Sequence, residues 1–276
     1  MKKDWISCIL LVCIFLSCKV IKTNKSLNFP KVEVSVTPIA NKSEVWVFIM
    51  AGQSNMAGRA FVEPNDTILN NRILTINKNG DLIYAKEPLH YYEPIKTGLD
   101  CGLSFGKTLI KSLPNNITIL LIPAAIGGSS ISQWLGDSTH RGVKLLSNFK
   151  EKVAIARKYG DIKGILWHQG ETDAYNHESL QYTQRLSLLC SQFRNMIGDT
   201  SLPILLGEIG SYSKVKAQWD SVNQSIRAYS KMDARTAIIE TSDLKQLGDY
   251  EHFTSKSVRI LGKRYAKAYQ NKFLIY

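Results

Sequence analysis

The chain has 276 residues, of which 44% are hydrophobic and 21% charged, a balance typical of globular proteins that excludes a disordered, fibrous or polytopic membrane protein. Lysine plus arginine exceed aspartate plus glutamate by 35 to 23, giving a formal net charge of +12. Such an excess can indicate nucleic acid, an anionic surface or an acidic glycan as a partner, but the basic residues are spread thinly, so we expect most to lie on solvated helix faces.

The first residues have the pattern of an export signal. Lysines at 2–3 precede an apolar stretch over 6–16, which is too short to span a bilayer because a spanning helix needs roughly 20 residues. Cys18 follows Phe15-Leu16-Ser17, as in the lipobox of bacterial lipoproteins, where cleavage leaves the cysteine as a lipid-bearing amino terminus. We therefore expect a signal over 1–17 and export to the bacterial periplasm, outer membrane or cell surface, with Cys18 as lipid anchor. Simple secretion and an uncleaved anchor are alternatives.

The rest of the chain is long enough for one hydrophobic core. Residues 18–43 are polar and lack helical periodicity, so we expect a tether there and a single domain over 44–276. Beyond residue 18 the cysteines are Cys101 and Cys190, which make no disulfide framework; the sequence does not show whether they pair. No CxxC, HExxH or EF-hand pattern occurs, so nothing in the sequence argues for a structural metal.

Five apolar runs have the length and composition of strands buried on both faces of a parallel sheet. They lie at 45–51, 117–122, 162–167, 203–207 and 236–240. Helical segments are predicted at 103–113, 143–158, 177–197 (capped by Asn176), 215–231 and 255–271. A hairpin is predicted over 72–84, around Asn79-Gly80. This alternation of strands and helices favours an α/β fold, a parallel sheet between layers of helices.

Polar residues and glycines gather where the predicted strands end and before the last helix. They are Ser54, Gly127-Gly128, Gln169 with Glu171, and Asp249 with His252. A serine becomes a nucleophile when a histidine accepts its proton and a carboxylate holds the other ring nitrogen. N–H groups at a glycine-rich turn and a side-chain amide can stabilise the negative charge that develops on an acyl oxygen. Because parallel strands deliver their carboxyl ends to one edge, these residues can meet there.

Each element also has a simpler interpretation. Ser54 or its neighbour can be an ordinary helix cap, Asp249 and His252 a local capping pair, and Gln169 a structural residue. A second cluster, of His168, Glu171, Asp173 and His177, could be a metal site, but its spacing matches no recognised ligand pattern. Gly106-Lys107-Thr108 suggests a phosphate-binding loop, which is rejected because Cys101 stands where that loop needs a glycine.

Four motifs, in this order, resemble those of the sialate O-acetylesterase domain. They are GQSNMAG at 52–58, GGSSI with Trp134 at 127–134, WHQGETD at 167–173 and DYEH at 249–252. This group includes the acetylxylan esterases of carbohydrate esterase family 6 and belongs to the SGNH hydrolase superfamily. The resemblance covers roughly residues 45–270 and implies a flavodoxin-like three-layer α/β/α sandwich with a central five-stranded parallel sheet.

The resemblance also implies serine ester hydrolysis without a cofactor. Ser54 would be the nucleophile, His252 the base and Asp249 its orienting carboxylate. The oxyanion would be held by the backbone N–H groups of Ser54 and Gly128 (or Gly127) and by the side chain of Gln169. Gln53 and Glu171 would support the site, Glu171 by orienting the region of Gln169.

The implied substrate is an O-acetylated carbohydrate, deacetylated through an acetyl-Ser54 intermediate, and neither nucleic acid nor a metal is expected to bind. Sialic acid is one candidate and acetylxylan or another plant glycan is the alternative. A non-catalytic glycan-binding lipoprotein is a further alternative, although a binder has no need of a base-paired serine. Trp134 could stack on a sugar ring or be buried against the sheet. Arg59 could pair with a substrate carboxylate or be solvated at the surface.

Overall fold

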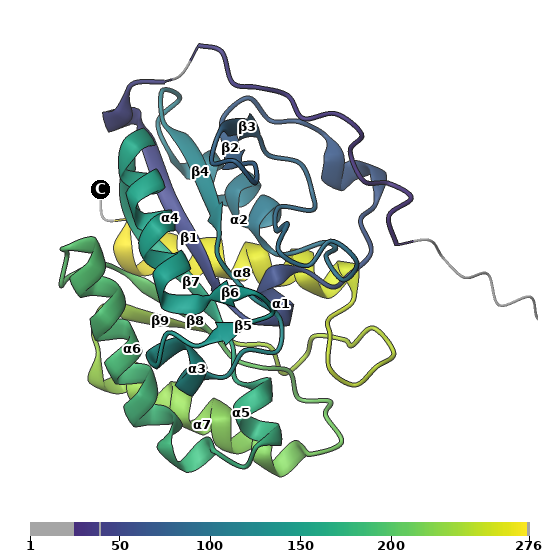
Figure 1. The fold of residues 1–276 in the computed structure, drawn as a ribbon, viewed down its shortest axis with the longest axis vertical. Coiled ribbons are helices and arrows are strands. Elements are labelled where there is room, and N and C mark those ends of the chain that lie inside the picture. The colour runs from purple at the N-terminus through teal and green to yellow at the C-terminus, as the bar shows by residue number, and fades with distance from the viewer. Residues whose placement is uncertain (1–24, 39, 275–276) are drawn as a thin grey trace, which may run out of the picture.

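A seven-stranded sheet runs through the middle of the molecule, in the order β3-β2-β4-β1-β7-β8-β9 (Figure 1). The computed structural model describes residues 25–38 and 40–274. Its strands are β1 (Val45–Gly52), β2 (Ile73–Ile76), β3 (Leu82–Tyr84), β4 (Thr118–Pro123), β7 (Asp161–His168), β8 (Ile204–Gly207) and β9 (Thr236–Ile239). All neighbouring strands are parallel except the β2–β3 pair. A separate antiparallel hairpin joins β5 (Thr139–His140) to β6 (Val143–Lys144).

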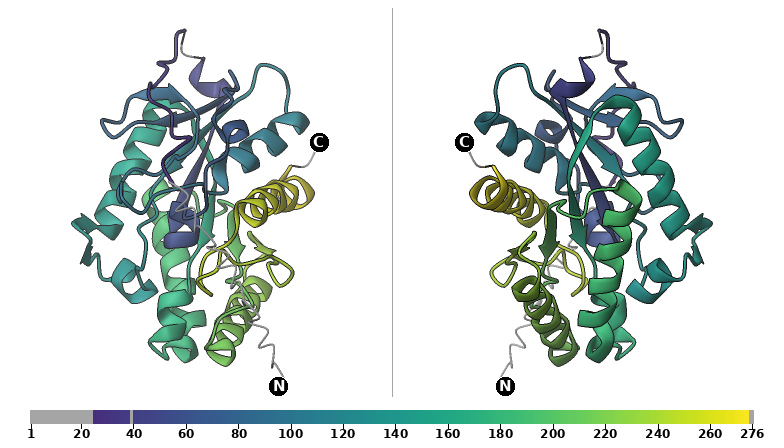
Figure 2. Two further views of the ribbon diagram at one scale, coloured as in Figure 1. Left: turned by 90° about the vertical axis from the view of Figure 1, so that its right-hand side faces the viewer. Right: turned by 90° about the vertical axis from the view of Figure 1, so that its left-hand side faces the viewer.

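Helices cover both faces of the sheet, with α4 and α6 on one face and α2 and α8 on the other (Figure 2). The helices are α1 (Ser54–Ala57), α2 (Gly102–Leu109), α3 (Ile131–Leu135), α4 (Leu145–Tyr159), α5 (Glu171–Tyr175), α6 (Tyr182–Ile197), α7 (Lys216–Met232) and α8 (Ser255–Phe273), with short 3₁₀ turns at Lys42–Glu44, Pro64–Thr67, Ile110–Ser112 and Ser179–Gln181.

Strand β1 explains why the sheet needs both layers. Its alternate side chains enter two different cores: Val47 and Ile49 pack with α4 and α6, whereas Phe48 and Met50 pack with α2 and α8. All four are fully buried. An uninterrupted apolar run is therefore required here, because neither face of the strand meets water.

The prediction of a five-stranded sheet was wrong in number, since β2 and β3 extend the sheet to seven strands. These two strands are the predicted hairpin, which pairs through β2 with the edge of β4 in parallel. The five runs predicted as core strands form β1, β4, β7, β8 and β9. The helix predicted over 177–197 begins only at Tyr182, and its N-cap residue is Gln181 rather than Asn176.

The part of the predicted tether that the structure describes lies against the domain. The amide of Asn28 donates to the carbonyl of Val62 at 2.9 Å, and the N–H of Tyr84 donates to the carbonyl of Val34 at 2.9 Å. Ser35 forms an isolated antiparallel bridge with Ile83 of β3. This edge strand has unpaired main-chain groups, and the segment satisfies some of them.

The predicted signal and the lipidation site Cys18 lie outside the described residues. Within residues 25–38 and 40–274, we find no helix with both the length and the apolar character needed to cross a bilayer. Cys101 and Cys190 are both buried and unpaired, which answers the question that the sequence left open.

The chain changes direction across the sheet at β1. Strand β4 pairs with one side of β1 and β7 with the other, so the carboxyl ends of all three strands lie together. Ligands of open α/β sheets bind at such a point. Ser54 follows β1, Gly127 follows β4 and Gln169 follows β7, which is the convergence that the sequence predicted.

Candidate active site

The turn between β1 and α1 fixes the position of Ser54. Gly52 has φ +135°, and a Cβ atom there would lie 2.1 Å from the carbonyl oxygen of His168, so only glycine fits. The N–H of Gln53 donates to that same carbonyl at 2.9 Å. The strand thus ends against β7, and Ser54 begins a short helix with its side chain almost entirely shielded from solvent.

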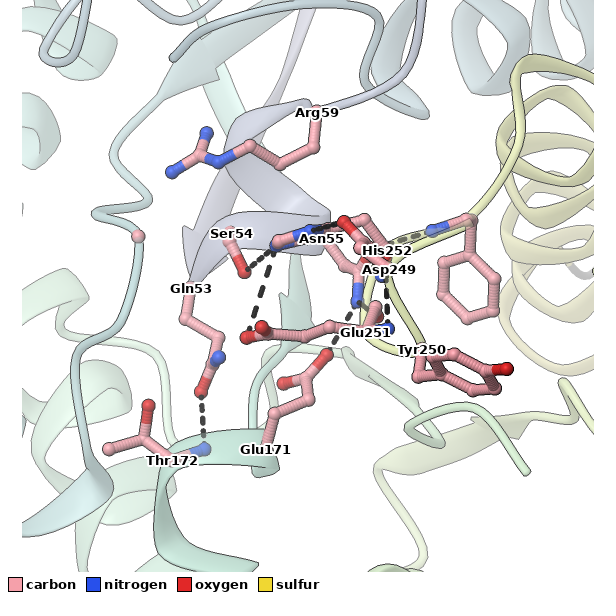
Figure 3. Close-up of polar contacts among 12 residues, drawn as sticks. Gln53, Ser54, Asn55, Arg59, Glu171, Thr172, Asp249, Tyr250, Glu251 and His252 are labelled. Atoms are coloured by element: carbon pink, nitrogen blue, oxygen red, sulfur yellow. Dashed lines mark hydrogen bonds and ion pairs between the residues drawn. The ribbon is translucent and has the colours of Figure 1, made fainter. Parts of the chain in front are cut away.

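Ser54, His252 and Asp249 form a continuous chain of hydrogen bonds (Figure 3). The Oγ of Ser54 lies 2.9 Å from Nε2 of His252, and Nδ1 of His252 lies 2.7 Å from Oδ2 of Asp249. A carboxylate can only accept, so Nδ1 carries the proton and Nε2 is left free to accept from the serine hydroxyl. This is the arrangement of a nucleophile, its base and the group that orients the base.

Asp249 is kept ionised by its own loop. Although partial burial favours the neutral carboxyl, the N–H groups of His252 and Glu251 donate to Oδ1 at 2.8 and 3.0 Å, and the pKa of Asp249 falls below its ordinary value. The carboxylate is therefore ready to stabilise a positive charge on His252. The carboxylate of Glu251 also faces the ring, with Oε1 4.0 Å from Nε2 (Figure 3).

Asn55 ties this loop to the rest of the site. Its Nδ2 donates to Oε1 of Glu171 at 2.6 Å and to the carbonyl of Glu251 at 3.1 Å, and its Oδ1 accepts from the N–H of Phe253 at 3.2 Å. The residues on both sides of His252 are thereby bound to the helix that carries Ser54. Glu171 supports this arrangement by accepting from Asn55. Among the described residues, the side chain of Gln169 is held by Gln53 and Asp173 and not, as predicted, by Glu171.

The turn after β4 carries the second predicted oxyanion donor. The N–H of Gly127 donates to Oε2 of Glu93 at 2.7 Å, and the same carboxylate forms ion pairs with Arg59 and Arg141. No acceptor for the N–H of Gly128 is found among the described residues. The backbone N–H of Ser54 is likewise without an acceptor in this part of the chain. Both groups therefore remain available to a ligand.

The prediction that the side chain of Gln169 donates to the oxyanion was wrong, because this amide is bound to other residues. Its Nε2 lies 3.0 Å from Oε1 of Gln53, 3.0 Å from the carbonyl of Ser129 and 2.5 Å from Oδ2 of Asp173. An amide nitrogen has two N–H donors, and these three acceptors engage both. Gln53, predicted only to support the site, has a buried Nε2 for which no acceptor is found in the described chain, so Gln53 is the side-chain amide with donors to spare.

Two tentative substrate-binding residues are also corrected. Trp134 is fully buried, donates from Nε1 to Oγ of Ser129 at 2.9 Å and packs edge-on against Trp167, with ring centroids 5.5 Å apart. It belongs to the core, as the alternative interpretation held. Arg59 is neither solvated nor free for a substrate: it is buried, and its Nη2 lies 2.7 Å from Oε2 of Glu93.

The residues considered as a metal cluster serve other contacts. Glu171 faces Asn55, while Asp173 accepts from Gln169 and from the N–H of Ile131. Burial lowers the pKa of His168 to about 3, so its ring is neutral. Among the residues that the structure describes, no group of three or more His, Cys, Asp or Glu is arranged to hold a metal ion.

The buried acid Glu171 predicts a dependence of stability on pH. Burial raises its pKa from 4.5 to about 7, against the opposing hydrogen bond from Asn55. The folded protein therefore holds this proton up to a higher pH than the unfolded chain, and the contribution of Glu171 to the free energy of unfolding falls as the pH rises from 4.5 to about 7. Glu171→Gln, which keeps an oxygen for Asn55, should lose this dependence. As the pH rises over that range, the Tm of the variant should increase relative to the Tm of the wild type.

Thermal unfolding at a series of pH values measures this difference. Glu240→Gln is the matched control, because Glu240 is exposed and should leave the pH profile of the wild type unchanged. Parallel Tm profiles for the wild type and Glu171→Gln would show that Glu171 is ionised alike in the folded and unfolded states, contrary to the prediction.

Taken together, the structure is an α/β fold with a mostly parallel sheet, whose carboxyl edge carries a hydrogen-bonded serine, histidine and aspartate. The chain belongs to the family of carbohydrate esterases described as sialic acid-specific acetylesterases, whose family model matches residues 44–271. The match covers all four motifs on which the resemblance was based, and the recognition of the family is confirmed.

Relatives agree with this assignment. A probable carbohydrate esterase of Arabidopsis thaliana is 29% identical over 267 residues, which cover 87% of this chain and 98% of the relative. A solved structure of an Arabidopsis thaliana protein is 27% identical with a TM-score of 0.73, covering 83% and 98% of the two chains. Two further solved structures share the fold. NanS is 17% identical with a TM-score of 0.66, and the match covers 84% of this chain and 98% of NanS. A carbohydrate acetylesterase from Xanthomonas citri is 20% identical with a TM-score of 0.62, and the match covers 83% of this chain and 56% of that one.

Among the residues that sequence reasoning left without a role, Asn55 had a visible signal, since it directly follows the nucleophile in the first motif. Glu251 likewise lies within the last motif. Glu93 had none, because it lies in an irregular region and its contacts with Gly127, Arg59 and Arg141 form only in the folded chain.

Proposed function

We propose that the protein removes O-acetyl groups from a carbohydrate through an acetyl-Ser54 intermediate. The observation that carries this proposal is the chain of hydrogen bonds from Ser54 through His252 to Asp249, with spacings of 2.9 and 2.7 Å. A serine so paired is the nucleophile of acyl transfer, and membership of a carbohydrate esterase family supplies the class of substrate.

The proposed mechanism uses only side chains and backbone groups of the chain. His252 accepts the proton of Ser54 through Nε2 while Oγ attacks the acetyl carbonyl. The N–H groups of Ser54 and Gly128 stabilise the oxyanion, and the imidazolium, held by Asp249, then donates its proton to the departing sugar oxygen. Water, activated by His252, releases acetate and restores the serine.

Among acetylated sugars, we propose sialic acid first. The description of the family supports it. A shallow pocket of about 390 Å³ beside the oxyanion turn also supports it, since Lys96 in its lining is cationic and Pro94 and Ile95 are apolar. The other two lining residues, Glu93 and Arg141, form an ion pair with each other. A carboxylated sugar can use both features. Acetylxylan is the alternative substrate. We also retain as a proposal that the protein is exported and anchored through Cys18.

The test is to incubate the wild-type protein with O-acetylated sialic acid and, in parallel, with acetylxylan, and to measure the acetate released. Acid-quenched samples are digested and searched for an acetyl group on the peptide that contains Ser54. We expect acetate from the sialate and acetylation at Ser54. Acetate released from acetylxylan but not from the sialate would change the proposed substrate to xylan and leave the proposed esterase activity in place. Neither acetate nor an acetylated peptide, with an aryl acetate also left intact, would favour the non-catalytic binder.

A further inference from the structure

The peptide unit between Gly127 and Gly128 is a weak point of the proposed oxyanion site. Both flanking residues are glycines, and Gly128 has φ +76°, so side chains impose little barrier to rotation of this peptide. The carbonyl of Gly127 and the N–H of Gly128 belong to one planar trans unit and point in opposite directions. A flip would therefore turn a carbonyl oxygen toward the position that the N–H is meant to serve.

A contact from the β5–β6 hairpin opposes this flip. Nε2 of His140 lies 3.0 Å from the carbonyl oxygen of Gly127. His140 is half-buried and pairs with Val143 across the hairpin, whose turn residues Arg141 and Gly142 both have positive φ. The same turn sends Arg141 to the carboxylate of Glu93, which accepts the N–H of Gly127. The hairpin thus holds Gly127 directly at its carbonyl and indirectly at its N–H.

The surrounding hydrogen bonds define which nitrogen of His140 carries the proton. Oε1 of Gln133 accepts the N–H of Ser130 at 2.9 Å, which turns Nε2 of Gln133 toward Nδ1 of His140, 3.5 Å away. Nδ1 is therefore the acceptor and Nε2 the donor. A carbonyl oxygen can only accept, so this tautomer is the one that binds Gly127.

We infer that His140 is a positioning residue for ester hydrolysis: its Nε2–H holds the carbonyl of Gly127 and thereby aims the N–H of Gly128 at the oxyanion. His140 does not contact the reacting atoms in this role. The inference rests on the proposed function, since an oxyanion donor has meaning only if Ser54 attacks an ester.

Three variants test it. His140→Gln keeps an N–H donor at a similar reach, His140→Phe keeps a ring but removes the donor, and Lys144→Ala changes an exposed residue of the same hairpin. Loss of one oxyanion donor costs on the order of 10²–10³ in kcat, and a misaimed donor less, so we expect His140→Phe to lower kcat for p-nitrophenyl acetate by about 10–100-fold with little change in KM. His140→Gln should recover most of this loss, and Lys144→Ala should match the wild type.

A second readout separates aiming of the donor from a general effect on structure. A thiocarbonyl sulfur is a poor hydrogen-bond acceptor, so an intact oxyanion site favours p-nitrophenyl acetate over its thiono analogue. We expect the ratio of kcat/KM for the two esters to fall in His140→Phe and to be restored in His140→Gln. An unchanged kcat in His140→Phe overturns the inference. The inference is also overturned if His140→Phe and His140→Gln lose kcat alike while the ratio of kcat/KM for the two esters stays at the wild-type value.

The proposed function can fail separately. If the wild-type protein shows no ester hydrolysis that requires Ser54, both the proposed function and the role of His140 are overturned. An active wild type whose activity requires Ser54, together with an equally active His140→Phe, overturns the role of His140 alone.

Discussion

Replacing Ser54 by alanine should reduce the hydrolysis of p-nitrophenyl acetate to the background rate. Loss of the nucleophile in a serine triad lowers kcat by roughly 10⁶, because the base and the carboxylate cannot act without the group that they activate. The hydroxyl of Ser54 is the group that Nε2 of His252 faces at 2.9 Å. The measurement is the steady-state rate of aryl acetate hydrolysis, with the fold checked by thermal unfolding.

Ser242→Ala is the matched control, since Ser242 is exposed and lies outside the site, and its rate should equal that of the wild type. Should Ser54→Ala keep more than about 1% of the wild-type rate, a different nucleophile or a bound water would have to carry the reaction, and the assignment of Ser54 would be lost.

The second large effect is expected for His252→Ala, which should lower kcat by about 10⁴–10⁶ because the proton of Ser54 then has no acceptor. The loop itself should persist, since Oδ1 of Asp249 is held by backbone N–H groups and Asn55 binds on both sides of position 252. The site would thus keep its nucleophile and its carboxylate around an empty space.

Added imidazole should therefore restore part of the activity of His252→Ala. The ring of His252 is partly exposed, with 17% of its side chain accessible, so a small base can reach its place. The same imidazole should have no effect on Ser54→Ala, which serves as the control, and Lys256→Ala in the first turn of α8 should behave as the wild type. A variant that keeps full activity without imidazole would remove His252 from the proposed mechanism.

The sequence predicted where the site lies because that depends on strand order along the chain. Buried strands are recognisable from runs such as 45–51, and the ends of parallel strands meet at one edge. The number of strands was not predictable in the same way. Pairing of β2 with β4 is decided by which edge is open in the folded sheet, and a short hairpin carries no local signal for that choice.

Within the site, residue type was a better guide than residue direction. Gln169 has a side-chain amide that could donate to an oxyanion, but this amide donates instead to the carboxylate of Asp173, four residues later. Trp134 follows a capping box between Ser130 and Gln133, which winds α3 so that the indole enters the core. The burial of Arg59 depends on Glu93, a contact that no local pattern announces.

The hydrogen bond that the N–H of Phe253 donates to Asn55 joins the beginning of the domain to its end, across 198 positions of the chain. A chain synthesised only as far as α7 holds Ser54 but lacks His252. Ser54 therefore meets His252 only when these two distant parts of the chain have folded against each other.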